Sequence, residues 1–141
     1  LRMAIESDDR FVLDLREFDR TGPSFTVQTL ESFVSEDPNA TLFFIMGEDS
    51  LAEFPTWYQP ERILHLAHLA VACRPGTDVD LASIGRKLPA ATGRIDMVET
   101  PELEISSSLI RERRRKGIMI RYLVPAEVEH YITDRQLYAA R

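Results

Sequence analysis

A run of three serines followed by an arginine is the part of this sequence best suited to bind phosphate. Ser106, Ser107 and Ser108 stand where a strand is expected to end and a helix to begin, and Arg111 follows within one turn. The first N–H groups of a helix lack partners, and the helix dipole adds positive charge there. Serine hydroxyls cap such turns or donate to oxygens, and a guanidinium matches phosphate. An ordinary capped helix fits these residues equally well.

Two other predicted strands also end in residues that could contact a ligand. Gly47 would let a ligand approach the backbone, and Asp49 could accept hydrogen bonds from ribose hydroxyls or simply cap a helix. Arg74, in an Arg-Pro-Gly turn, could reach a phosphate or lie on the surface.

An aromatic loop and a helix start offer a second kind of contact. Trp57 is the only tryptophan, and its ring could stack on a flat heterocycle or fill the edge of the core. Thr26 lies in the first turn of a predicted helix, where it could cap that helix or donate to a ligand.

The remaining candidates for chemistry are weak. His65 and His68 have a spacing that metal sites use, but no third ligand is evident, so no metal site is predicted. Cys73 is the only cysteine and has apolar neighbours, which is typical of a core residue. A chain without a possible internal disulfide is expected in a reducing compartment, the cytoplasm.

Length and composition predict one globular domain, residues 1–141, without a membrane or nucleic-acid partner. The net charge of −6 argues against general binding to nucleic acid. No apolar run approaches the roughly 20 residues of a membrane span.

Apolar runs alternate with segments of helical periodicity along the whole chain. This alternation predicts an α/β fold with a parallel sheet, whose ligands bind beyond the carboxyl ends of the strands. Strands are expected at 11–15, 41–46, 68–73 and 95–99, and helices at 24–35, 60–66, 79–88, after the serines, and at 125–138.

Two of these elements have predicted faces. The continuous apolar run at 41–46 predicts a strand buried on both faces. In the last helix, Val128, Tyr131 and Ile132 are expected to face the core.

Taken together, the motifs resemble bacterial nicotinate-mononucleotide adenylyltransferase, a nucleotidyltransferase. The motifs occur in the family's order and cover residues 1–138: Phe-Phe-Ile-Met-Gly-Glu-Asp, Phe-Pro-Thr-Trp-Tyr, Arg-Pro-Gly, Ile-Ser-Ser-Ser-Leu-Ile-Arg-Glu-Arg and Ile-Arg-Tyr-Leu-Val-Pro. The resemblance implies a Rossmann-like parallel sheet with helices on both faces. It also implies transfer of the adenylyl group of ATP to nicotinate mononucleotide in NAD biosynthesis.

The resemblance also assigns roles to residues. It places ATP at Gly47, Asp49, Ile105, Ser106, Ser108 and Arg111, and the nicotinate nucleotide at Thr26, Trp57 and Arg74, with Trp57 stacked on the pyridine ring. Mg²⁺ would accompany ATP, and no residue of this chain is assigned as a metal ligand. A homo-oligomer is left open.

One motif of the family is missing from this sequence. Its Gly-rich turn and His-x-Gly-His motif, which polarise the ATP phosphates, would precede Leu1, so no catalytic residue is assigned and the 141 residues alone are expected to be inactive and poorly folded. The alternatives are a related enzyme that uses nicotinamide mononucleotide or phosphopantetheine, and a nucleotide-binding module without catalysis.

Overall fold

The structure, a computed structural model, describes residues 1–73, 80–101 and 103–139. The chain divides into two compact units. We call Leu15–Glu102 the sheet unit, and Leu1–Asp14 together with Leu103–Arg141 the helical unit. The prediction of a single domain stays a prediction.

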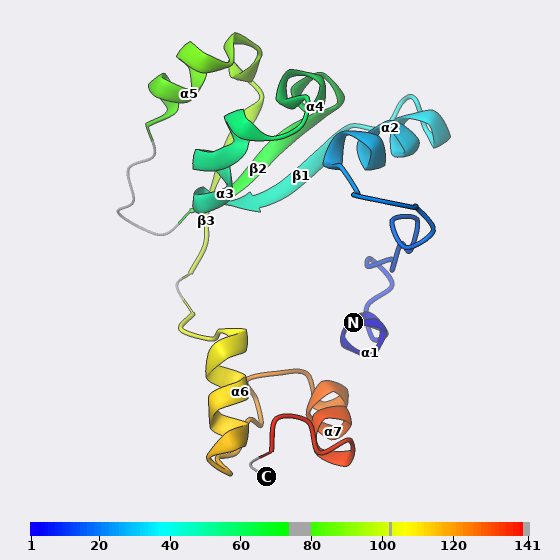
Figure 1. Cartoon of the computed structure of the whole chain (residues 1–141), viewed down its shortest axis with the longest axis vertical. Coiled ribbons are helices and arrows are strands. Elements are labelled where there is room, and N and C mark those ends of the chain that lie inside the picture. The colour runs from blue at the N-terminus through cyan, green and yellow to red at the C-terminus, as the bar shows by residue number, and fades with distance from the viewer. Residues whose placement is uncertain (74–79, 102, 140–141) are drawn as a thin grey trace. The chain divides into compact units, whose positions relative to one another are not determined.

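Within the described residues, the sheet unit is built on three parallel strands (Figure 1). They are β1 (Leu42–Gly47), β2 (Ala67–Cys73) and β3 (Ile95–Glu99), in the order β1-β2-β3. Leu42 lies opposite Ala67, and Leu69 lies opposite Ile95. The predicted α/β class with a parallel sheet is therefore confirmed.

The core of the sheet unit lies on one face of this sheet. Alternate residues of β2 are buried, because successive side chains of a strand point to opposite faces. The helices cover that face with apolar side chains, as their spacing requires. The most deeply buried members of this core are Leu51, Phe54, Ile63, Leu64, Leu69 and Val71.

The other face of β1 is open, which corrects the prediction that this strand is buried on both sides. Phe43 is 57% exposed and Ile45 is 77% exposed. Both alternate with the covered residues Leu42 and Phe44, which pack against the core. A continuous apolar run predicts a buried strand, but it does not say whether a second layer is present.

The described residues of the sheet unit contain helices close to the three predicted at 24–35, 60–66 and 79–88, and one at 48–53 that was not predicted. They are α2 (Thr26–Glu36), α3 (Glu48–Glu53), α4 (Pro60–Leu66) and α5 (Leu81–Lys87), with 3-10 turns at Phe54–Thr56 and Pro89–Ala91. Pro60 occupies the first turn of α4, where a missing N–H costs nothing. None of the helices described is long and apolar enough to cross a membrane.

The helical unit contains α1 (Arg2–Ile5), α6 (Ser107–Arg115) and α7 (Ala126–Asp134). Its small core joins Ile110, Ile120 and Ile132.

Two sequence-based expectations near these elements were wrong. Residues 11–15 form no strand, and Phe11 and Val12 are exposed. A strand needs a neighbour for its N–H and C=O groups, and an apolar run alone does not supply one. Tyr131 is 43% exposed rather than buried, whereas Ile132 on the same helix is buried as predicted and Val128 is partly buried.

Leu69→Ala tests whether the stability of the sheet unit depends on the central strand. In the full-length protein the change should lower the free energy of unfolding by about 3 kcal/mol, because it leaves a cavity in a packed core. Leu81→Ala removes the same atoms from a side chain that is 40% exposed and should cost far less. Urea denaturation measures both, and equal losses would contradict this description of the core.

Candidate functional site

The start of α6 combines a capped helix with free N–H groups. Ser106 is the N-cap, and its hydroxyl accepts a hydrogen bond from the Leu109 N–H at 3.1 Å. Within the described chain, the N–H groups of Ser107 and Ser108 have no acceptor. The capping and phosphate-binding interpretations are therefore compatible, because the cap uses one N–H and leaves two others available to an anion.

The first arginine of α6 points back toward this helix start. The Arg111 Nη2 donates to the Ser108 hydroxyl at 3.1 Å. Both residues line an open pocket of about 500 Å³, together with Glu112, Arg115 and Lys116. Three cations and one carboxylate therefore surround the pocket, a charge balance that favours an anionic ligand.

The one carboxylate of this pocket is already paired. Lys116 Nζ donates to Glu112 Oε1 at 2.5 Å across one turn of α6. This hydrogen bond, helped by the charges of Lys116 and Arg115, holds the pKa of Glu112 below its usual value. Glu112 therefore stays ionised at neutral pH and offsets part of the positive charge around the pocket.

Arg113, in the same basic run, contacts the chain just beyond the end of α6. Arg113 donates from Nε and Nη2 to the Met119 carbonyl at 3.0 and 2.9 Å. Gly117 has φ +67°, and the N–H of Ile118 reaches the Arg113 carbonyl at 2.8 Å. This is the left-handed helix ending that glycine adopts most easily.

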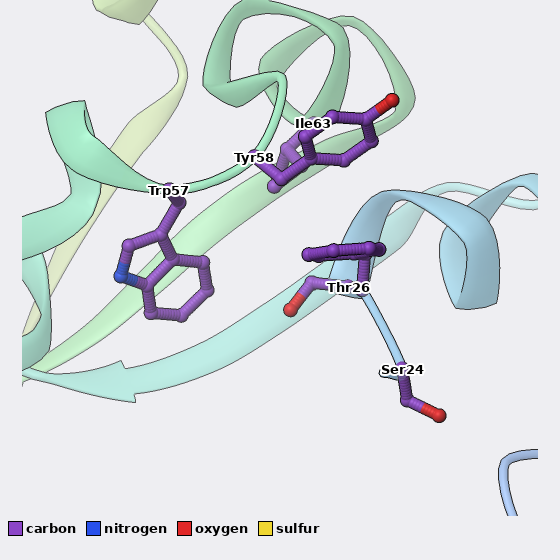
Figure 2. A pocket seen from close by; sticks show the side chains of 6 residues that line it. Ser24, Thr26, Trp57, Tyr58 and Ile63 are labelled. Atoms are coloured by element: carbon purple, nitrogen blue, oxygen red, sulfur yellow. The ribbon is translucent and has the colours of Figure 1, made fainter. Parts of the chain in front are cut away.

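A second pocket, of about 210 Å³, lies at the start of α2 in the sheet unit (Figure 2). Trp57 and Tyr58 come from the loop before α4, and Thr26 is the first residue of α2. The residues that line the pocket are Ser24, Phe25, Thr26, Trp57, Tyr58 and Ile63. The pocket thus brings together Thr26 and Trp57, the residues predicted to bind the nicotinate nucleotide.

The start of α2 carries no side-chain cap. Its N-cap is Phe25, which has no acceptor to offer, so the interpretation of Thr26 as a cap is wrong. The N–H groups of Thr26 and Val27 have no acceptor among the described residues. Thr26 is partly exposed and lines the pocket, whereas Val27 is buried in the core. The start of α2 at Thr26, with the positive end of its helix dipole, suits a negatively charged group on a flat ring in this pocket.

Trp57 fills the edge of the core and also lines the pocket. Its ring meets Phe44 edge-on at 5.8 Å and lies 5.5 Å from Phe54, so part of it belongs to the core. The residue is only half-buried and lines the pocket as well. One part of the indole is therefore fixed by packing while another part remains available to a ligand.

Gly47 ends β1 in an unremarkable backbone conformation. Its φ of −88° is open to any residue, and a Cβ added there would meet nothing within 4 Å. The described fold therefore gives no internal reason for glycine. Gly47 is the N-cap of α3, so Asp49 lies in the first helical turn, exposed, and is not the cap.

The other predicted residues are placed as follows. Ile105, Ser106, Ser108 and Arg111 lie together in the helical unit, whereas Gly47 and Asp49 lie in the sheet unit. Arg74 lies outside the described residues. Sequence reasoning did not single out Tyr58 or Phe25, although an aromatic residue next to Trp57 was an available signal.

The histidines and the cysteine take ordinary structural roles. His68 Nδ1 lies 3.1 Å from Asp96 Oδ2, and His65 Nδ1 lies 2.6 Å from the Glu61 carbonyl. Cys73 is buried and donates to the Val98 carbonyl at 3.3 Å. Among the described residues, no group of three His, Cys, Asp or Glu could hold a metal ion.

A parallel α/β sheet, together with helix N-termini whose N–H groups lack acceptors, is typical of nucleotide-binding proteins. Residues 1–113 match the cytidylyltransferase-like family model. A protein named a probable nicotinate-nucleotide adenylyltransferase in Thermomicrobium roseum is 44% identical over 98% of this chain and 64% of its own length. One with the same name in Marinomonas is 41% identical over 96% of this chain and 68% of its own. The chain therefore belongs to the cytidylyltransferase-like family, in the group of nicotinate-nucleotide adenylyltransferases.

The chain spans about two thirds of the length of these relatives. Among solved structures, a nicotinic acid mononucleotide adenylyltransferase from Plasmodium falciparum in complex with NaAD superimposes with a TM-score of 0.65. The match covers 91% of this chain and 62% of that one, at 24% identity. A likeness at this identity supports the nucleotidyltransferase fold.

Ser106→Ala tests how much the Ser106 hydroxyl stabilises the protein as the N-cap of α6. The change should lower the free energy of unfolding by about 1 kcal/mol, because the Leu109 N–H loses its acceptor. Ser107→Ala is the matched control, since its hydroxyl makes no hydrogen bond in the described chain, and Ser106→Asp should retain the cap. Urea denaturation of the full-length protein measures all three, and equal stability of Ser106→Ala and Ser107→Ala would contradict the capping role.

Proposed function

We propose that this protein transfers the adenylyl group of ATP to nicotinate mononucleotide. A phosphate oxygen of the mononucleotide attacks the α-phosphorus of ATP, and the bond from that phosphorus to the bridging oxygen breaks. Deamido-NAD and pyrophosphate are the products. The observation that supports this acceptor best is the aromatic pocket at Trp57, which Thr26 at the start of α2 also lines.

The acceptor pocket favours nicotinate over nicotinamide on electrostatic grounds. A pyridine ring against Trp57 would bring its ring substituent toward Thr26 at the start of α2. The positive end of the helix dipole stabilises a carboxylate there and does little for a neutral amide. A phosphopantetheine acceptor has no flat ring to use the aromatic wall.

The donor half of the reaction fits the start of α6. The N–H groups of Ser107 and Ser108 and the Arg111 guanidinium would contact ATP phosphate oxygens, with Arg115 and Lys116 adding positive charge. Such groups lower the barrier by stabilising the charge that develops on the leaving pyrophosphate. Gly47 and Asp49 would contact the adenosine part of ATP, where glycine leaves room.

Mg²⁺ would arrive with ATP rather than occupy a site of its own in the charged pocket. The pocket has one carboxylate, Glu112, and Lys116 is bonded to it. Such a donor set does not fit a hard cation that prefers several oxygen ligands. Bound to the phosphates, Mg²⁺ would neutralise part of their charge.

Product formation tests the proposed function. The full-length protein is incubated with ATP and, in parallel reactions, nicotinate mononucleotide, nicotinamide mononucleotide or phosphopantetheine, and the products are separated by chromatography. We expect deamido-NAD to form with the highest kcat/KM. Preference for another acceptor would support a related transferase, and the absence of any product would support a nucleotide-binding module.

Arg111→Ala should impair the donor half of the site without unfolding the protein. We expect kcat/KM for ATP to fall about 30-fold, because hydrogen bonds to charged groups contribute about 1.5–3 kcal/mol. Arg135→Ala, an exposed arginine at the end of α7, is the control and should leave the rate unchanged. A wild-type rate for Arg111→Ala would remove this residue from the phosphate site.

Trp57→Ala should raise KM for nicotinate mononucleotide more than KM for ATP. We expect KM for nicotinate mononucleotide to rise about tenfold, as loss of base–aromatic stacking costs about 1–3 kcal/mol. Trp57→Phe retains a ring and should show a smaller rise. Steady-state kinetics measure both variants, and equal increases in the two KM values would argue against stacking.

A further inference from the structure

Gln59 precedes α4 in a backbone conformation that glutamine seldom adopts. Its φ and ψ are 54° and 55°, and it is the N-cap of α4. The left-handed region favours glycine and asparagine, and N-caps favour serine, threonine, aspartate and asparagine. The Gln59 side chain makes no capping hydrogen bond. Neither the backbone nor the helix start therefore explains a glutamine here.

The Gln59 side chain instead contacts the neighbouring tyrosine. Its Nε2 lies 3.1 Å from the Tyr58 hydroxyl. The Tyr58 ring in turn lies 4.5 Å from the Phe25 ring, at an interplanar angle of 36°. Both rings line the pocket that Trp57 and Thr26 share.

This aromatic pair stands at the surface, where packing alone leaves a ring several orientations. Tyr58 is 51% exposed and Phe25 is 37% exposed. A hydrogen bond at the far end of the Tyr58 ring restricts those orientations, because it fixes the hydroxyl as well as the Cβ. Figure 2 shows Trp57 and Tyr58 on different sides of the pocket.

We propose that Gln59 is a positioning residue that holds Tyr58 against Phe25, and that this pair forms the outer wall of the acceptor pocket. The proposal rests on the proposed function, since the wall would face the pyridine ring of nicotinate mononucleotide across from Trp57. Because the wall is already held in place before binding, less conformational entropy is lost when the acceptor binds. Gln59 thus contributes to acceptor affinity without touching the acceptor.

A double-mutant cycle tests the link between the two residues. Tyr58→Phe and Gln59→Met, made in the full-length protein, each remove one partner of the hydrogen bond and keep the size of the side chain. We expect each to raise KM for nicotinate mononucleotide about fivefold, because each removes the hydrogen bond between Gln59 and the Tyr58 hydroxyl. The double variant should be no worse than either single variant, and kcat and KM for ATP should stay within about twofold.

Gln136→Met is the matched control. Gln136 is also exposed and also has a positive φ, 49°, but in the described chain its side chain has no hydrogen-bond partner. The same substitution there should leave KM for the acceptor unchanged. An unchanged KM in Tyr58→Phe, or a double variant with the product of the two single effects, would overturn the proposal.

A measurement made without substrate distinguishes failure of the positioning role from failure of the proposed function. Nuclear Overhauser effects between the Phe25 and Tyr58 rings should weaken in Gln59→Met and persist in Gln136→Met. A wild-type protein that makes no deamido-NAD would contradict the proposed function alone. Unchanged ring contacts in Gln59→Met would contradict the positioning role, whatever the enzyme assay gives.

Discussion

The sheet unit depends on the burial of its central strand. β2 pairs with β1 on one side and β3 on the other, and its inward side chains, including Leu69 and Val71, are fully buried. Parallel strands require crossovers, so the segments between them must return over the sheet as helices. That requirement fixes α3 and α4 between β1 and β2, and with them the loop that bears Trp57. The position of the pocket beside Trp57 therefore follows from how β2 is buried.

Each pocket uses a helix start in a different way. In α6 the N-cap Ser106 satisfies one N–H and leaves two donors to an anion, while Arg111 bends back to the same place. In α2 the N-cap is Phe25, which satisfies none, and its ring becomes part of the pocket wall. Capping and binding thus compete for the same N–H groups, and the residue type at the N-cap decides how many stay available.

Local sequence patterns predicted most of the helices and strands. Contacts between residues far apart in the sequence determined which apolar runs form strands and which side chains meet. The apolar runs at 41–46, 68–73 and 95–99 became strands, because each has a partner of matching length. The run at 11–15 is also mainly apolar but forms no strand, and composition does not reveal that difference. The contact between Tyr58 and Phe25 was not predicted, because the two residues are far apart in the sequence although their rings lie 4.5 Å apart. The positive φ of Gln59 was equally invisible, since glutamine does not signal that conformation.

A crystal structure of the full-length protein with deamido-NAD tests the central claim most directly. The account predicts the pyridine ring against Trp57, with its carboxylate at the start of α2 beside Thr26. A product bound with its pyridine ring away from Trp57, or with its carboxylate away from the start of α2, would contradict the account.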